Sequence, residues 1–222
     1  MAETASAQPA DMSYREEEAS FYHEASLNAA WVGSRLALGA LTFGFGAFVF
    51  AFFYLRSTDS FGRWYPAGFH APGTDLGTLI MALVVASAAI QTLALQQLKH
   101  GRKAPWTAGA LTALALGLAA IGVQVWQLLN LPFFPGSSGF ASVFVGFSPV
   151  FAALVFVTML WLHMLIGRSR PLPEMSFVEQ PPTYAAAFAV QRFQASLSSF
   201  TLVWNYLAAV TIVMWVLFYL VH

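Results

Sequence analysis

The fold of this chain is decided by LALGALTFGFGAFVFAFFYL, residues 36–55, a stretch without charge that lies between Arg35 and Arg56. About twenty residues in an α-helix cover roughly 30 Å, which is the thickness of the hydrocarbon core of a bilayer. A helix of this length in a soluble protein would carry a polar face. We therefore expect residues 36–55 to form a transmembrane helix.

Four further stretches have the same apolar character. Only 9% of the residues are charged and 58% are hydrophobic, so the chain has too few polar side chains for a water-facing surface. The sequence predicts an all-α fold, a polytopic membrane protein built as a bundle of five transmembrane helices. The expected spans are residues 36–55, 76–98, 108–131, 140–167 and 197–221.

The spans belong to one transmembrane domain over residues 31–222, which follows a polar, acidic and partly disordered N-terminal segment, residues 1–30. Eight lysines and arginines fall on the side of the N-terminus, whereas only Arg56 and Arg63 fall on the other side. By the positive-inside rule, the N-terminus is cytoplasmic and the C-terminus lies outside. We expect a multi-pass protein of the cell inner (plasma) membrane.

Cationic and indole side chains sit favourably at the level of lipid headgroups. Trp31 and Arg35 on the inner side, and Arg56 and Trp64 on the outer side, are therefore candidate lipid contacts. The inner ends of four spans also carry a tryptophan each, as expected for an interfacial belt, namely Trp31, Trp106, Trp161 and Trp204.

Small and polar residues within the spans indicate how the helices pack. Gly109, Ala113 and Gly117 recur every four residues, which favours close helix packing, within this chain or against another subunit. Uncharged polar side chains and one histidine are candidates for interhelical hydrogen bonds rather than for chemistry. These are Gln124, Gln127, His163 and Asn205.

The sequence offers little catalytic chemistry. All ten carboxylates lie outside the spans, and the absence of cysteine excludes thiolate-held zinc, iron–sulfur clusters and disulfides. His163 is the only histidine within a span and lies near the cytoplasmic end of that span, so a bis-histidine haem is not expected. We expect no catalytic, cofactor-binding or metal-binding residues in this chain, and a net charge of zero gives no case for nucleic acid.

Several stretches match, in order, those of a known family. They are Phe45–Arg56, Trp64–Pro66, Gln124 with Trp126 and Gln127, Gly146–Phe147, and Val203–Tyr219. Together they resemble subunit III of the haem-copper oxidases, the cytochrome c oxidase subunit 3 family, and in particular its five-helix members. Leu41 stands where that family has a buried glutamate, so a direct part in proton uptake does not follow from the resemblance.

The resemblance implies a non-catalytic subunit of a terminal oxidase in the aerobic respiratory chain. Its partners would be the catalytic haem-copper subunit I, other oxidase subunits and phospholipids, with haem and copper held by the partner. Two alternatives remain open. One is a subunit III-like accessory protein of a nitric oxide reductase complex, and the other is a small stand-alone transporter.

Overall fold

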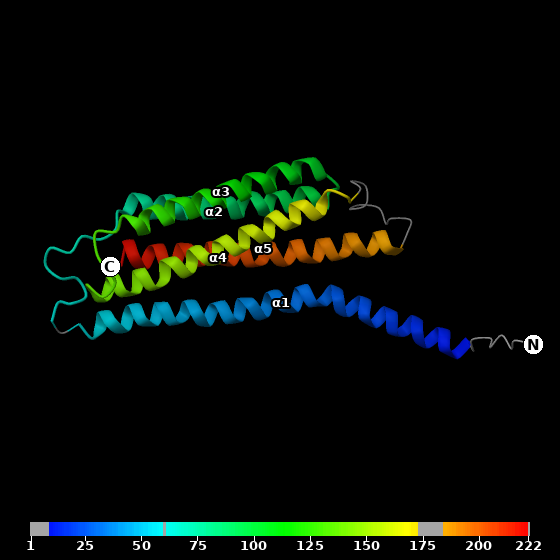
Figure 1. Cartoon of the computed structure of the whole chain (residues 1–222), viewed down its shortest axis with the longest axis horizontal. Coiled ribbons are helices and arrows are strands. Elements are labelled where there is room, and N and C mark those ends of the chain that lie inside the picture. The colour runs from blue at the N-terminus through cyan, green and yellow to red at the C-terminus, as the bar shows by residue number, and fades with distance from the viewer. Residues whose placement is uncertain (1–8, 60, 173–183, 222) are drawn as a thin grey trace, which may run out of the picture.

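The computed structural model describes residues 9–59, 61–172 and 184–221, which contain five α-helices (Figure 1). No strand occurs in these residues. Each helix is long and apolar enough to cross a membrane, so the predicted five-helix bundle of a multi-pass membrane protein is confirmed. The helices are α1 (Pro9–Ser57), α2 (Thr74–Lys99), α3 (Lys103–Leu129), α4 (Gly139–Ser169) and α5 (Tyr184–Tyr219).

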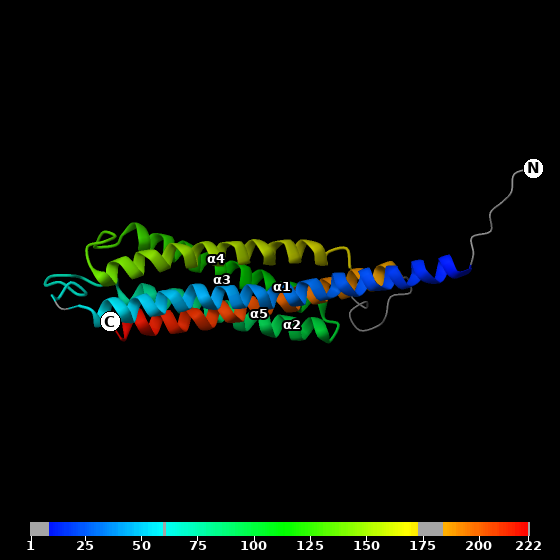
Figure 2. The same ribbon diagram turned by 90° about the horizontal axis from the view of Figure 1, so that it is seen from below.

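Consecutive helices run in opposite directions along the bundle (Figures 1 and 2). α2 packs against α3 and α5, and α4 packs against α3 and α5, so these four helices form a closed group. α1 lies along one side of the group, where it packs mainly against α4 and α5. The connection after α1 therefore crosses the end of the bundle to reach α2.

Small residues bring α3 close to its neighbours. A Cβ on Gly109 would lie 2.7 Å from the Ala94 methyl group of α2, and a Cβ on Gly117 would overlap Met159 of α4. Ala113, between the two glycines, is fully buried. The seam that the sequence left open as internal or intermolecular thus packs within the chain, with Gly109 towards α2 and Gly117 towards α4.

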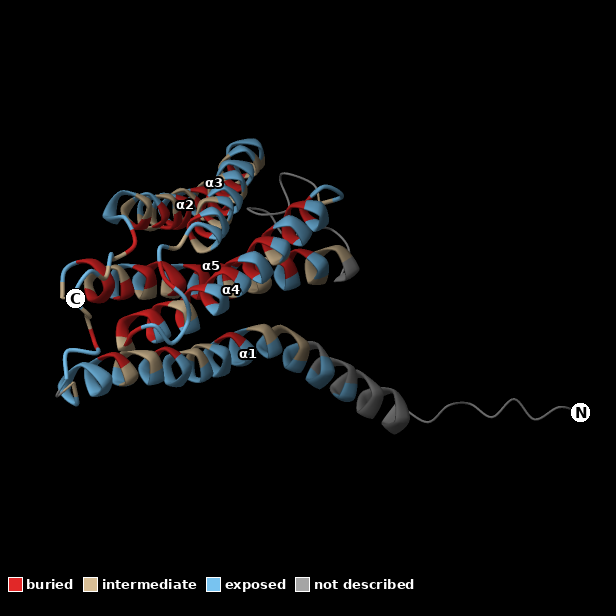
Figure 3. Cartoon of the chain, turned by 60° about the vertical axis from the view of Figure 1, so that its left-hand side comes forward, coloured by how far each residue is buried: buried red, intermediate tan, exposed pale blue. Residues whose placement is uncertain are grey.

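α1 is the most exposed helix. In its most apolar window 11% of the residues are buried, against 56% in α5, and Figure 3 shows its outer side almost wholly exposed. Residues 9–30, which the sequence assigns to a polar and acidic segment ahead of the transmembrane domain, are helical and continue into the membrane-spanning part of α1 without a break. Alanine, glutamate and arginine favour helix there although they carry no apolar signal. Residues 1–8 lie outside the described part.

One end of the bundle, here called the aromatic end, is closed by aromatic rings from α1, α4, α5 and the connections between α1 and α2 and between α3 and α4. Phe140 is fully buried at its centre, stacked on Phe144 at 5.9 Å between ring centroids. The other rings around Phe140 meet it edge to face, and both arrangements add to the packing energy of each ring. Further rings packed on Phe140 are Trp64, Tyr65, Phe69, Phe133 and Phe218.

The loop after α1 folds back over the aromatic end. The Asp59 carboxylate accepts hydrogen bonds from the backbone N–H groups of Arg63 (2.6 Å) and Trp64 (2.9 Å). Chiefly because of the Trp64 N–H, the pKa of Asp59 lies below its usual range. The Trp64 ring packs edge-on against Phe52 of α1 at 4.9 Å, and the Gly139 N–H donates to the Arg63 carbonyl at 3.1 Å. The loop is thereby joined to both α1 and α4.

The opposite end, here called the basic end, holds the C-termini of α2 and α4 and the N-terminal parts of α3 and α5. The Lys103 ammonium donates to the carbonyl of Arg170 at 3.1 Å and to that of Leu172 at 2.6 Å. A cation in this position stabilises the end of α4, where carbonyls lack partners in the helix. The basic end is defined by Lys99, Arg102, Lys103, Arg168, Arg170 and Arg192.

The tryptophans expected as an interfacial belt fall into two groups. Trp31 is 54% exposed, as a belt residue would be, but Trp106 and Trp204 are fully buried. Trp204 donates from Nε1 to the hydroxyl of Ser87 on α2 at 3.2 Å, and Trp106 packs edge-on against Phe193 of α5 at 5.6 Å. The belt interpretation is wrong for these two residues, because neighbouring helices cover them.

Candidate functional site

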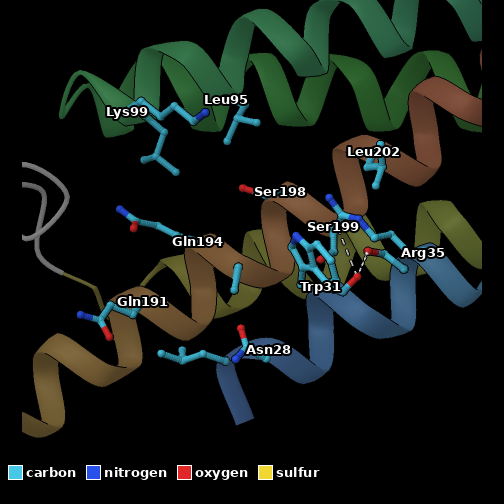
Figure 4. A pocket seen from close by; sticks show the side chains of 14 residues that line it. Asn28, Trp31, Arg35, Leu95, Lys99, Gln191, Gln194, Ser198, Ser199 and Leu202 are labelled. Carbon is cyan, nitrogen blue, oxygen red and sulfur yellow. Dashed lines mark hydrogen bonds between the residues drawn. The ribbon is translucent and has the colours of Figure 1, made fainter. Parts of the chain in front are cut away.

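A cleft of about 700 Å³ opens at the basic end between α1, α2 and α5 (Figure 4). We call it the inner cleft, because its lining includes Trp31 and Arg35, the two residues that the sequence analysis expects on the inner side of the membrane. α2 forms one wall, α1 forms the opposite wall, and α5 lies between them. The volume is in the range of sites that hold small organic ligands.

The α1 wall presents an ordered cation. The Arg35 guanidinium lies over the Trp31 ring, 3.5 Å from the centroid, and donates to the Trp31 carbonyl at 3.3 Å. A cation held over an indole face is attracted by the ring and loses little mobility when it binds a ligand. Ser199 of α5 donates to the Ala30 carbonyl at 2.8 Å, which fixes this wall to α5.

The α2 wall carries a second cation at its end. Lys99 is the last residue of α2 and lines the inner cleft together with Leu95 and Leu98. Leu98 is almost fully buried at 2% exposure, whereas Lys99 is exposed. This wall therefore offers an ammonium group next to an apolar surface.

α5 contributes amide and hydroxyl groups along one side. Gln191, Gln194 and Ser198 line the inner cleft at spacings of three and four residues, and Leu202 follows one turn further on. Residues at these spacings share a face of a helix. The lining along α5 thus changes from hydrogen-bonding groups to a leucine in the direction of the apolar part of the bundle.

Sequence reasoning found only the α1 part of this site. It selected Trp31 and Arg35, which the structure brings together, but missed Lys99, Gln191 and Gln194. The signal for Lys99 was present, because a lysine that ends one helix and an arginine that precedes another apolar stretch lie at the same end of an up-and-down bundle. The choice of α5 as the third element required the packing itself.

The two outer candidates for lipid contact lie at the aromatic end, away from the inner cleft. Arg56 is exposed and donates to the backbone carbonyl of Val221, which ties the end of α1 to the end of the chain. Trp64 is only 6% exposed, because Phe52, Phe140 and the backbone of Gly139 surround it. The expectation of a lipid contact at Trp64 is corrected accordingly.

Gln124 and Gln127 point from α3 into the bundle. The Gln124 amide donates to the Ser148 carbonyl of α4 at 3.0 Å, and the Gln127 amide donates to the Tyr219 hydroxyl of α5 at 2.9 Å. Both amides are buried, and both line a small cavity of about 40 Å³ near the aromatic end. The hydrogen bonds connect three helices where lipid cannot satisfy polar groups.

His163 and Asn205 do not form a pair. The Asn205 amide donates to the Thr92 hydroxyl of α2 at 3.1 Å, whereas His163 is exposed on α4. The two residues sit on helices that pack together, but on faces that point in different directions. The structure therefore gives Asn205 an interhelical role with α2 and leaves His163 on the outer surface.

Within the described residues, no group of three or more histidines and carboxylates lies close enough to hold a metal ion. In the inner cleft, charged, polar and apolar side chains of the described residues converge. In comparisons with protein-family models and with curated proteins, neither a family nor a relative matches the chain.

Proposed function

We propose that this chain is a non-catalytic membrane subunit of a respiratory terminal oxidase, similar to subunit III of the haem-copper oxidases. It flanks a catalytic subunit that holds haem and copper, and it stabilises that subunit in the plasma membrane, with its own N-terminus in the cytoplasm. The observation that carries the proposal is the uncovered face of α1, which is suited to packing against another helix.

This uncovered face is here called the Phe–Gly face. It consists of residues at alternating intervals of three and four on the outer side of α1. Its large members are strongly exposed, with 85% for Phe43 and 68% for Phe50. Its glycines have open space, since a Cβ at Gly39 or Gly46 would meet nothing within 4 Å. The face comprises Leu36, Gly39, Phe43, Gly46 and Phe50.

The glycines distinguish a helix partner from lipid. A glycine inside a helix costs about 1 kcal/mol relative to alanine, and lipid contact gives nothing in return. At Gly77, Gly109 and Gly117 of α2 and α3, the space that a Cβ would take is filled by a side chain of a neighbouring helix. Gly39 and Gly46 have the same character without a neighbour in this chain, so a close-packed helix from a partner gives them a role.

The stretches that resemble the oxidase subunit also meet in space. Residues 54–56 lie in the last helical turn of α1, and Arg56 joins this turn to Val221. Phe52 packs against both Trp64 and Phe218 of α5 at the aromatic end. These contacts bring together segments from both halves of the chain. They support the proposal because the resemblance rests on the order and spacing of these same stretches.

The proposal is tested by purifying the complex in a mild detergent through a tag on this chain. Haem a or haem o with copper and a large polytopic partner is the expected result. A b-type haem with non-haem iron would move the chain to a nitric oxide reductase, and a colourless solitary chain would contradict the subunit role. Deleting the gene should leave the haem spectrum of the partner intact while shortening the time over which the enzyme keeps turning over.

A pair of variants tests the Phe–Gly face itself. Replacing Gly39 and Gly46 with isoleucine should reduce the amount of partner that co-purifies, because the branched side chains hold a neighbouring helix away. The matched control is Gly122→Ile on α3, which is also helical with open space around it. Equal loss of partner in the control would show that the effect is not specific to α1.

A further inference from the structure

The small cavity of about 40 Å³ near the aromatic end, here called the polar cavity, is enclosed by α2, α3, α4 and α5. Its polar side chains are each at most 8% exposed. They belong to apolar helices, where lipid offers no hydrogen bonds. Any hydrogen bond that they make is therefore with the protein or with a molecule that the protein encloses. The polar cavity is defined by Gln124 and Gln127 of α3, Ser148 of α4 and Tyr219 of α5.

The direct hydrogen bonds use only part of what these four side chains offer. The Gln124 amide nitrogen donates to the backbone carbonyl of Ser148. The Gln127 amide nitrogen donates to the Tyr219 hydroxyl. Within the described residues, the two amide oxygens accept no hydrogen bond, and neither the Ser148 hydroxyl nor the O–H of Tyr219 donates one. At least two acceptors and two donors are thus left over in one cavity, and buried polar groups without a partner are strongly unfavourable.

A glycine on α2 fixes the place of one of these groups. Gly77 lines the polar cavity, and a Cβ on it would overlap the ring and the hydroxyl of Tyr219. Glycine is unfavourable inside a helix, because it gains less than other residues from helix formation. At this position, however, it lets the phenol lie against the backbone of α2. The Tyr219 hydroxyl is thereby held in the polar cavity, within reach of Gln127.

The size and the charge of the polar cavity decide which molecule fits it. A water molecule needs about 10–15 Å³ of such a volume, so a cavity of about 40 Å³ has room for about two or three. No carboxylate occurs among its described lining residues, so a cation there would lie in the bilayer without a counter-charge. An apolar molecule would leave the spare donors and acceptors unpaired. Water both donates and accepts, and it therefore matches the groups that are left over.

We propose that the polar cavity is a binding site for water. The bound water accepts hydrogen bonds from the Ser148 hydroxyl and the O–H of Tyr219. It donates to the side-chain oxygens of Gln124 and Gln127. The water thus joins α3, α4 and α5 through hydrogen bonds that no direct contact supplies. The assignment does not depend on the proposed function, because every group involved belongs to this chain.

The test is radiolytic labelling of the purified full-length protein in detergent, with water enriched in ¹⁸O. X-rays convert a bound water into a hydroxyl radical, which adds to an aromatic ring within reach before it can diffuse away. Phe151 lines the polar cavity, whereas Phe200, the matched control, is equally buried and packs edge-on against Trp161. Hydroxylation of Phe151 with ¹⁸O should be severalfold faster than that of Phe200. Equal rates at the two rings would overturn the proposal.

Two variants remove polar groups from the cavity one at a time. Gln124→Leu removes an acceptor at similar size, and Ser148→Val removes a hydroxyl and takes up space. Each should lower the labelling of Phe151 to the rate of Phe200, and circular dichroism shows whether each remains helical. The control Thr158→Val removes a buried hydroxyl of α4 that donates within its own helix, and it should leave the labelling unchanged.

Two other results would contradict the assignment. Labelling of Phe151 that persists in both Gln124→Leu and Ser148→Val would show that the radicals come from bulk solvent rather than from a bound water. Labelling that changes severalfold when sodium ions are removed from the buffer would show a hydrated cation as the occupant of the polar cavity.

Discussion

The two ends of this bundle are built from the same five helices, yet one is closed and the other is open. At the aromatic end Phe140, Phe144 and Phe218 are each at most 3% exposed, and a loop covers them. At the basic end two clefts of about 700 Å³ and 470 Å³ separate the helices. The closed end has the packing of a structural core, whereas the open end has the properties of a binding site.

The difference follows from the residues at each end. Aromatic rings attract one another edge to face and fill space, so the aromatic end closes without help. Cations repel one another, and those at the basic end lie on separate helices. Tight packing, which stabilises the fold, is therefore concentrated at the aromatic end, and space for a ligand at the basic end.

The largest expected effect comes from the centre of the closed end. Phe140→Ala should lower the free energy of unfolding by about 3 kcal/mol, because it leaves a cavity among six aromatic neighbours. Leu202→Ala at the inner cleft should cost less than about 1 kcal/mol, since that side chain is partly exposed. Unfolding in mixed detergent micelles measures both. Equal costs would remove the distinction between the ends.

A smaller effect is expected where a glycine makes room for a ring. Gly77→Ala on α2 should cost about 1–3 kcal/mol, because the added methyl group would overlap Tyr219. Gly46→Ala on α1 should be neutral or slightly stabilising when the chain is alone, since nothing lies within 4 Å of the new Cβ. The same unfolding measurement applies. A loss of stability in Gly46→Ala would contradict the open space described for α1.

Two tyrosine hydroxyls allow a matched test of buried and exposed hydrogen bonds. Tyr219→Phe removes the bond from Gln127 at the closed end and should cost about 1 kcal/mol. Tyr206→Phe removes the exposed bond with Thr42 and should cost a few tenths of a kcal/mol. Hydrogen exchange and unfolding of both variants give the comparison. A larger loss for Tyr206 would show that α1 is held to α5 more tightly than its exposure indicates.

The smallest expected effect is pH-dependent and concerns the loop over the aromatic end. The pKa of Asp59 is lower in the folded protein than in the unfolded chain, so its contribution to stability is present above the unfolded value of about 3.9. The contribution is lost as the pH falls through the folded pKa. Hydrogen exchange at Arg63 and Trp64 should be faster in Asp59→Asn than in the native protein at pH 7. The two proteins should converge as the pH falls through the folded pKa of Asp59, and an unchanged difference once the carboxyl is protonated would argue against a role of the carboxylate.

Much of the fold could be predicted from sequence, because an uncharged stretch such as residues 36–55 has few alternatives to a membrane helix. Residues 9–30 carry charges and no long apolar stretch, so the sequence allows a helix there but does not show that it continues unbroken into the membrane span. Trp106 and Trp204 were assigned to the interface from their depth, but depth does not reveal which side of a helix its neighbours cover.

The inner cleft was predictable only in part for a related reason. Trp31 and Arg35 are four residues apart on one helix, so their contact is a local property of the sequence. Lys99 and Gln194 line the same cleft from two other helices. Their position there depends on the way α5 packs between α1 and α2. Local spacing carries no information about such a meeting point.

The packing of α1 against α4 and α5 has a consequence for the order in which the protein is made. When α1 leaves the ribosome, both of its neighbours are still unsynthesised, and α5 begins roughly 130 residues later. At common rates of translation this delay is on the order of ten seconds. The α2–α3 hairpin can form during that time, while α1 lies in the bilayer before α4 and α5, the helices of its own chain against which it packs, have been inserted. A partner helix that recognises the Phe–Gly face could therefore join before the last helix is inserted, so that assembly would begin during synthesis.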